Sequence, residues 1–518
     1  MSDIKLHLRG IDGLIIIICI VASSIIFLSD VHEFNKALLF LPIVFVFCYT
    51  LILAPLRNRT ASKTVLWFTI AEFIRLVFVP CYESINQYVG FYGFSTDDTA
   101  LLTRSVLLMS YECLFLSVFL FIILRHRVDA VFEVSSSGND ALADSVLEDK
   151  TEVASIGKDV LTDEVLEDKT EITPLGKDVL ALVIVLLIGV FIYFIVPEVR
   201  RTINFLVLES NSAKIRALTT GSHSSLVVGL ITFTYYSFLC GFIIALDYAK
   251  RRYDLSGRKL YVFLGAFFGV ITVSFINGES RSTTVYTLYA IIQCLCICFK
   301  RYKKHITRVL FVSGGVVLLG ITAYRLFAVY KHSSYSDAIQ GGSLRDNYIP
   351  AFIEMYCLGP QSVACGIQFS DLMHGDFTIG TFFYDIFRPF MGLNFIAKAF
   401  DGSTSIMMYN SWFSGVQGKS NGLFLQIANQ GYCYFGLFLA PVFACVFLRI
   451  AIFIERKLKQ TKNLFLIFFF NFVYIRLATC VIAGTMSGYI TTITMSLIMC
   501  GSIYLLQKFV SSTIRRKI

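Results

Sequence analysis

Long apolar runs separated by short polar segments are the feature that most limits what this 518-residue chain can fold into. A bilayer core about 30 Å thick is crossed by roughly 20 apolar residues in a helix, and an open strand cannot satisfy its backbone there. The runs that meet this length are 11–29, 37–55, 64–82, 101–124, 179–197, 225–247, 260–278, 284–299, 309–330, 432–448, 464–484 and 488–507. We therefore predict an all-α polytopic membrane protein with about 12 transmembrane helices.

The composition agrees with that class, because 56% of the residues are hydrophobic and only 16% are charged. These values exclude an ordinary soluble globular protein. The net charge of +9 is attributed to attraction toward lipid headgroups, and no nucleic-acid partner is expected.

The basic residues predict the orientation of the spans, since cytoplasmic loops are enriched in Lys and Arg. Short dense clusters such as "AKRRYDLSGRK", "KRYKKHITR" and "ERKLKQTK" fall on one side, whereas segment 331–431 holds only five Lys and Arg. Both termini are therefore predicted to be cytoplasmic, and span 11–29 is predicted to be retained rather than cleaved as a signal peptide.

Five segments follow from this pattern: four spans in 1–124, a cytoplasmic loop at 125–178, central spans in 179–330, a large external loop at 331–431 and C-terminal spans in 432–518. The loop at 125–178 has 14 acidic and 6 basic residues and repeats "VLEDKTE" with a 19-residue period. Such a composition favours disorder. It is either a tolerated duplication or a docking segment for a cytoplasmic regulator.

The external loop mixes aromatic runs with Gly-rich turns and is predicted to be ordered. Its runs 348–358 and 379–400 are too short or too interrupted by Pro and Gly to cross a bilayer. They suit short helices at the membrane interface, so the membrane lipids are expected partners of this loop.

Arginines outnumber lysines on the predicted outer face. A guanidinium group binds phosphate oxygens bidentately and stays charged when partly dehydrated, so the set points to an anionic diphosphate ligand. Taken singly, each arginine is equally well explained by snorkelling or by an ion pair such as Glu72 with Arg75. The candidates for diphosphate binding are Arg75, Arg104, Arg216, Arg281, Arg325, Arg345, Arg388 and Arg476, with Glu279 beside Arg281 in "FINGESRSTT" and with Arg200 and Arg201 as further outer arginines.

One histidine stands out as a candidate base. His374 lies in "SDLMHGDFTIG" with Asp371 and Asp376 close by, and a neighbouring carboxylate can orient an imidazole. His332 is the second choice. No metal-ligand spacing, Gly-rich phosphate loop or nucleophile elbow is found, so no metal and no cofactor are predicted, and Cys357 and Cys365 are predicted to be free thiols.

The span number, the large loop in the C-terminal half, the turn "NGESRS" and the segment "GKSNGLFLQIANQGYCYFG" at 418–436 together resemble oligosaccharide repeat-unit polymerases of the Wzy type. These enzymes build O-antigen and capsular polysaccharides at the outer face of the bacterial plasma membrane. Relatives often carry an acid where this chain has Gln426.

The resemblance implies metal-independent glycosyl transfer between undecaprenyl-diphosphate-linked oligosaccharides, with a chain-length regulator as a possible partner. Arg281 and the other arginines would stabilise the leaving diphosphate, while His374 with Asp376 would take the acceptor proton. Glu279 would steer Arg281 or occupy it before substrate arrives.

Other classes of membrane protein remain open. A lipid-linked oligosaccharide flippase predicts charges at the bilayer midplane, and Arg476 and Glu112 are the residues that suit it. A ligase of the O-antigen type would share the arginine chemistry but use another acceptor. A membrane acyltransferase is disfavoured because its in-span histidine signature is missing.

Overall fold

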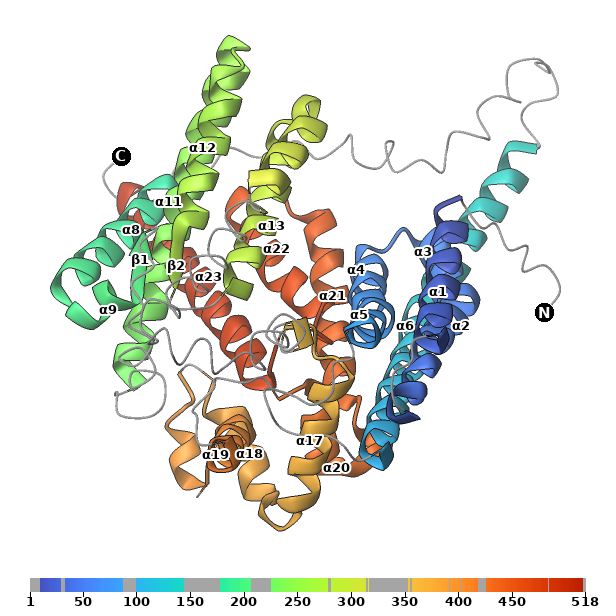
Figure 1. Cartoon of the computed structure of the whole chain (residues 1–518). Coiled ribbons are helices and arrows are strands. Elements are labelled where there is room, and N and C mark those ends of the chain that lie inside the picture. The colour runs from blue at the N-terminus through green and yellow to red at the C-terminus, as the bar shows by residue number, and fades with distance from the viewer. Residues whose placement is uncertain are drawn as a thin grey trace, which may run out of the picture.

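The computed structural model describes residues 10–28, 33–86, 99–143, 178–205, 225–277, 281–313, 315, 353–354, 356–390, 392–400, 402–417, 425–482 and 484–515. Helices make up nearly all of the described chain (Figure 1). The α-helices are α1 (Gly10–Leu28), α2 (Phe40–Cys48), α3 (Ala54–Thr60), α4 (Lys63–Phe73), α5 (Val79–Ile85), α6 (Thr99–Ala143), α8 (Asp178–Ile195), α9 (Pro197–Thr202), α11 (Ser225–Ser256), α12 (Leu260–Ser274), α13 (Arg281–Cys298), α17 (Pro360–Leu372), α18 (Ile379–Phe387), α19 (Ser405–Gln417), α20 (Ile427–Leu439), α21 (Val442–Gln460), α22 (Leu464–Ala478) and α23 (Met486–Arg515).

Shorter elements join or interrupt these helices. The 3₁₀ turns are η1 (Glu33–Leu39), η4 (Lys300–Tyr302), η5 (His374–Asp376) and η6 (Ile396–Ala399), and the π-helical turns are η2 (Tyr49–Leu53) and η3 (Ile74–Phe78). Strands β1 (Ile203–Phe205) and β2 (Phe275–Asn277) pair antiparallel, with Ile203 opposite Asn277. This ribbon ties the segment after α9 to the segment that leads into α13.

Six continuous helical stretches are long and apolar enough to cross a membrane, and up to eight are obtained if each of two sharply bent helix pairs counts as one span. The six are Ile11–Leu28, Lys36–Thr60, Lys63–Ile85, Thr99–Arg125, Gly229–Ser256 and Met486–Leu506. The predicted helical, multi-pass membrane class agrees with this finding. The predicted number of twelve spans is not confirmed, and neither is the large loop.

The difference in number has two physical sources. Three predicted spans correspond to apolar helices of fewer than 18 residues, Val179–Ile195, Leu260–Ser274 and Leu464–Ala478. Predicted span 432–448 is broken by a 105° bend between α20 and α21, where Gly436 has a φ of 72° and Pro441 precedes α21. Both residues interrupt helical geometry. Most of predicted span 309–330 lies outside the described residues.

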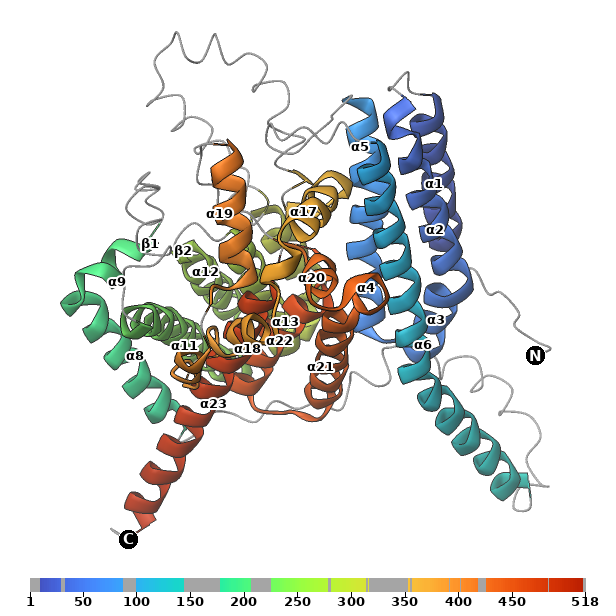
Figure 2. The same ribbon diagram turned by 90° about the horizontal axis from the view of Figure 1, so that it is seen from below.

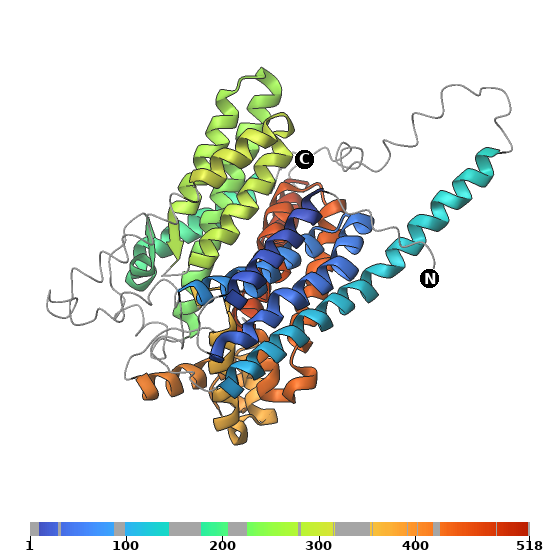
Figure 3. The same cartoon turned by 45° about the vertical axis from the view of Figure 1, so that its right-hand side comes forward.

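The helices are arranged in four groups. In Figure 1, α1 to α6 lie on one side, α8, α9, α11 and α12 lie on the other, and α13, α21, α22 and α23 lie between them. Helices α17 to α20 gather at one end of this bundle, and Figure 2 looks toward that end. We call this group the α17–α20 layer and the end that it covers the layer end. The turn between α11 and α12 lies at the opposite end (Figure 3).

The outer surface of the bundle is apolar, as a lipid-facing surface must be. Phe27, Phe191, Phe263 and Phe509 are each at least 65% exposed although they lie on long helices. A soluble domain does not expose large apolar side chains in such continuous bands. The interior holds one large apolar cluster shared by all the spans and a smaller one, around Phe369 and Phe413, inside the α17–α20 layer.

Helix α6 is longer than any bilayer requires. Residues Thr99–Arg125 form its membrane-length part, and the helix continues to Ala143. Figure 3 shows this extension projecting away from the bundle. The first part of predicted loop 125–178 is therefore helical, and residues 144–177, including both copies of the repeat, lie outside the described residues.

A single carboxylate fastens two helices at the end opposite the layer. Glu455 of α21 is buried and accepts hydrogen bonds at the N-terminus of α4 from Ser62 Oγ (2.8 Å), Lys63 N (3.0 Å), Thr64 N (3.1 Å) and Thr64 Oγ1 (2.6 Å). A carboxylate is favoured there because the first N–H groups of a helix have no partner within the helix.

Replacing this carboxylate should destabilise the bundle. Glu455→Ala leaves four donors without their acceptor, and we expect a loss of about 2–4 kcal/mol in the free energy of unfolding. Thermal unfolding of the full-length protein in detergent measures the loss. Asp254→Ala, at an exposed acid of α11, is the matched control, and an equal effect of both changes would contradict the capping role.

Candidate functional site

The described residues include only part of the predicted site. Glu279, Arg216, Arg325, Arg345 and His332 lie outside them. For Arg281 the structure describes the backbone, which begins helix α13 directly after the β1–β2 ribbon. The remaining predicted residues do not share one site, because some are buried among the helices of the bundle and others are exposed in the α17–α20 layer.

Arg75 is fully buried in an ion network between helices. Its Nη1 lies 2.5 Å from Glu112 Oε2 and 3.9 Å from Glu72 Oε1, and its Nε donates to the carbonyl oxygen of Leu358 at 3.0 Å. Gln426 donates to the same Glu112 oxygen at 3.0 Å. Arg75 is therefore engaged by the protein itself, within π-turn η3, and its fixed position joins α4, α6 and the α17–α20 layer.

Arg104 is held at the surface of the layer end. It forms a bidentate pair with Asp371, at 2.6 Å and 3.1 Å, and donates to the Tyr432 hydroxyl at 2.8 Å. Both partners of the ion pair are more than 40% exposed. Water screens such a pair, so this contact fixes α17 beside α6 at little energetic gain.

His374 and Asp376 lie a few residues further on, in the 3₁₀ turn η5 between α17 and α18. Both side chains are exposed, and so is that of Arg388 at the end of α18. These three residues share the α17–α20 layer with Arg104, whereas Arg75 lies inside the bundle.

Arg476 belongs to α22, one of the central helices of the bundle (Figure 1). It lies in the last turn of α22 and is half-buried, and no carboxylate among the described residues forms an ion pair with it. Its Nε is buried and has no hydrogen-bond partner in the described part of the chain. A charge that is partly removed from water and left without a counter-ion costs several kcal/mol, so its surroundings need explaining.

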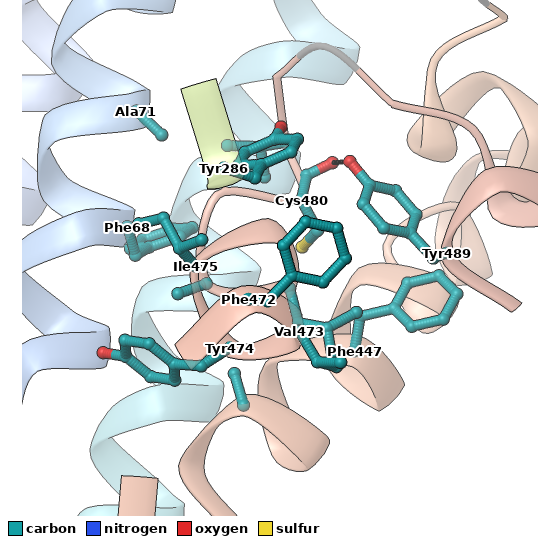
Figure 4. Close-up of a cluster of buried hydrophobic side chains, with 14 of the residues drawn as sticks. Phe68, Ala71, Tyr286, Phe447, Phe472, Val473, Tyr474, Ile475, Cys480 and Tyr489 are labelled. Carbon is teal, nitrogen blue, oxygen red and sulfur yellow. Dashed lines mark hydrogen bonds between the residues drawn. The ribbon is translucent and has the colours of Figure 1, made fainter. Parts of the chain in front are cut away.

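Two tyrosine rings flank this guanidinium group. The Arg476 Cζ atom lies 5.4 Å from the centre of the Tyr286 ring and 5.8 Å from that of Tyr489. Figure 4 shows these rings on either side of the chain around Cys480, where α22 ends. Each ring face stabilises a cation by about 0.5–2 kcal/mol, and the C-terminus of α22 adds up to about 1 kcal/mol. These contacts lower the free-energy cost of burying the charge but do not neutralise it.

The two tyrosines belong to helices α13 and α23, which both begin at the layer end. Tyr286 lies in α13, five residues after Arg281, so the Arg281 backbone is about 7.5 Å further along that helix axis. Arg281 and Arg476, which are 195 positions apart in the sequence, thus belong to one end of the bundle. The β1–β2 ribbon brings the C-terminal turn of α9, which contains Arg200 and Arg201, toward the same edge as the start of α13.

The Tyr489 ring is held in place by a tight turn between α22 and α23. The Tyr489 hydroxyl lies 3.3 Å from the carbonyl oxygens of Cys480 and Ile482. A Cβ atom at position 484 would overlap that hydroxyl, so the position admits only glycine without a shift of the ring. A Cβ atom added at position 488 would lie 3.4 Å from Arg476 Nη2.

Hydrogen bonds connect the same turn to the α17–α20 layer. Gln430 of α20 accepts from Met486 N at 2.9 Å and donates to Ser405 Oγ at 2.9 Å. Ser405 N in turn donates to Asp385 Oδ1 at 2.9 Å, and the Tyr434 hydroxyl donates to Asp385 Oδ2 at 2.7 Å. Burial raises the pKa of Asp385 above its usual range despite these donors. The layer is thus attached beside Arg476 through defined contacts.

Several of these residues were not predicted from the sequence. Tyr286, Tyr489, Asp385 and Gln430 are functional candidates only because the fold places them around Arg476 or the turn beside it. The available signal was the rule that polar groups at membrane depth need partners, which applies to acids and tyrosines as well as to arginines. No group of three or more His, Cys, Asp or Glu within the described ranges is arranged to hold a metal.

The buried ion network predicts an asymmetry between single and double replacements. Arg75→Met leaves two carboxylates buried without their cation, and we expect a loss of about 3–5 kcal/mol in unfolding free energy. Arg75→Met combined with Glu112→Leu should be distinctly more stable than Arg75→Met alone. Denaturation of detergent-purified variants tests this, and a double variant no better than the single one would contradict the ion-pair role.

The Gly484 contact predicts a steric coupling. Gly484→Ala should cost about 1–3 kcal/mol, and Tyr489→Phe should recover part of that loss by removing the overlapping hydroxyl. Gly501→Ala, in the open middle of α23, is the control and should be neutral or stabilising. A double-mutant cycle followed by thermal unfolding measures the coupling, and purely additive effects would refute it.

Comparison with known proteins adds no relative to this picture. No protein-family model, no curated protein and no solved structure matches the chain.

Proposed function

We propose that this chain is a membrane glycosyltransferase that joins oligosaccharide repeat units carried on undecaprenyl diphosphate, and that Arg476 binds a diphosphate. The observation that carries the proposal is a half-buried guanidinium group with an unpartnered Nε, no carboxylate partner among the described residues and two tyrosine walls. Guanidinium groups in such surroundings suit phosphate oxygens, which provide both the missing charge and the missing hydrogen-bond acceptors.

The surroundings of Arg476 also suit the rest of the substrate. Tyrosine rings stack on sugar faces and offer a hydroxyl for hydrogen bonding. The apolar bundle beside them suits a prenyl chain, and the exposed layer above suits hydrophilic sugars. Arg281, at the start of α13, is the second arginine in the proposed diphosphate site.

In the proposed reaction an acceptor hydroxyl attacks the anomeric carbon of the donor sugar. The new C–O bond forms as the bond from that carbon to the diphosphate oxygen breaks, and the electron pair stays on the diphosphate. Arg476 and Arg281 stabilise this charge, which is stronger in the transition state than in the bound substrate. The hydroxyl proton passes to a base of the α17–α20 layer, for which exposed His374, two residues before Asp376, is the candidate.

The orientation belongs to the same proposal. The layer end faces the outside of a bacterial plasma membrane, and both termini and the α11–α12 turn face the cytoplasm. The chain then forms about twelve spans with α17, α18 and α19 in the large external loop 331–431, and helix α18 lies at the interface with Ile379 and Phe383 toward lipid. A chain-length regulator is a further partner in this proposal.

Replacing Arg476 tests the function directly. Arg476→Gln removes the charge and should reduce polymer formation at least about 10- to 100-fold, and Arg476→Lys should restore it only partly because lysine cannot bind bidentately. Surface glycan from cells that produce each variant is separated by length. Arg258→Gln, at the exposed α11–α12 turn, is the matched control. Unchanged long chains with Arg476→Gln would overturn the assignment.

A lipid-linked oligosaccharide flippase is the second candidate, because the buried network of Glu72, Arg75 and Glu112 places charges deep among the spans. The same cells distinguish the two functions. A polymerase defect leaves single lipid-linked units displayed outside, whereas a flippase defect traps them in the cytoplasmic leaflet.

A further inference from the structure

A pair of buried acids joins the α17–α20 layer to the bundle. Glu83 lies in α5, and Glu354 lies just before α17; each is 0–1% exposed. Their carboxyl groups are within hydrogen-bonding reach of each other. No basic side chain of the described residues pairs with either of them.

The donors around this pair are too few for two carboxylates. Glu354 Oε1 accepts from Gln361 N at 2.8 Å. Glu354 Oε2 and both oxygens of Glu83 have no donor among the described residues. Two ionised carboxylates in contact, buried and with one donor between them, would repel each other strongly in a low dielectric.

The contact cannot simply open, because the backbone around it is closely packed. A Cβ atom at position 359 would overlap both Glu354 Oε2 and Val79 of α5, so Gly359 lets the two segments approach. Leu358, the preceding residue, has a φ of 52° and presents its carbonyl oxygen to Arg75. The turn is thus held on both sides in the position that brings the acids together.

We infer that Glu83 and Glu354 share one proton, and that the resulting hydrogen bond between carboxyl and carboxylate clamps the start of the α17–α20 layer onto α5. This inference does not depend on the proposed function, because neither glutamate is assigned to the diphosphate site. Its strength follows pH, because the shared proton is a bound ligand.

The other titratable groups that face the pair do not replace the proton. They are Cys357 on the same turn, Tyr409 of α19, and Arg75, which reaches the turn only through the Leu358 carbonyl oxygen. Burial raises the pKa of Glu354 above its usual range. A group with a raised pKa in the folded state stabilises the fold fully at low pH. That stabilisation is lost as the pH rises from the ordinary glutamate pKa, about 4.3, through the raised value.

Infrared spectroscopy of the full-length protein in nanodiscs tests for the proton. A protonated carboxyl group has a carbonyl stretch separate from that of a carboxylate. We expect such a band near neutral pH in the wild type and its loss in Glu83→Gln and in Glu354→Gln. Asp254→Asn, at an exposed acid, is the control and should keep the band. A band of equal intensity in wild type and both Gln variants would overturn the shared proton.

Hydrogen–deuterium exchange tests the clamp itself. After correction for intrinsic exchange rates, protection of residues 356–372 should fall as pH rises in the wild type. It should become independent of pH in Glu83→Gln, whose amide donates to Glu354 without a titrating proton. If the Gln variants do not fold, the wild-type titration decides alone, since protection that does not change with pH refutes the clamp. Replacing sodium by choline at fixed pH must have no effect, and a sodium dependence would show that a bound cation replaces the proton.

Discussion

The interaction on which the rest of the structure depends is the buried contact of Arg75 with Glu112. Arg75 follows α4, and its guanidinium group bonds to the Glu112 carboxylate of α6 and to the Leu358 carbonyl oxygen in the turn before α17. These three elements therefore meet at this contact. A charge so deeply buried has few alternative partners, so the network specifies one arrangement of these elements. The α17–α20 layer is thereby fixed over a particular end of the bundle.

Several contacts join the layer to the bundle besides the exposed Arg104–Asp371 pair, and three of them are of different kinds. The Arg75 network and the Glu83–Glu354 pair hold the start of the layer, and the hydrogen bonds through Gln430 hold its α20 side against the start of α23. The last of these contacts lies next to Arg476. A motion of the layer would therefore change the surroundings of Arg476, which has no ion-pair partner among the described residues. The stability of the layer is thus linked to the availability of the candidate site.

The sequence predicted the elements that depend on local pattern and missed those that depend on tertiary contact. Apolar runs predicted the membrane class, and the arginine bias of the outer face made Arg476 one candidate among several, which stays a prediction. Hydrophobic periodicity could not predict the 105° bend after α20. An apolar run has the same sequence pattern whether Gly436 adopts a helical or a left-handed conformation. Tyr286 and Tyr489 are 203 positions apart, and no local signal places both on one guanidinium group. The predicted free thiols at Cys357 and Cys365 are confirmed.

The extension of α6 sets the distance at which the following acidic segment is attached. From Arg125 to Ala143 the helix rises by about 27 Å, which is roughly three times the Debye length of about 8 Å at physiological ionic strength. Ala143, at the end of α6, therefore lies along the helix axis beyond the reach of a surface potential that begins at Arg125.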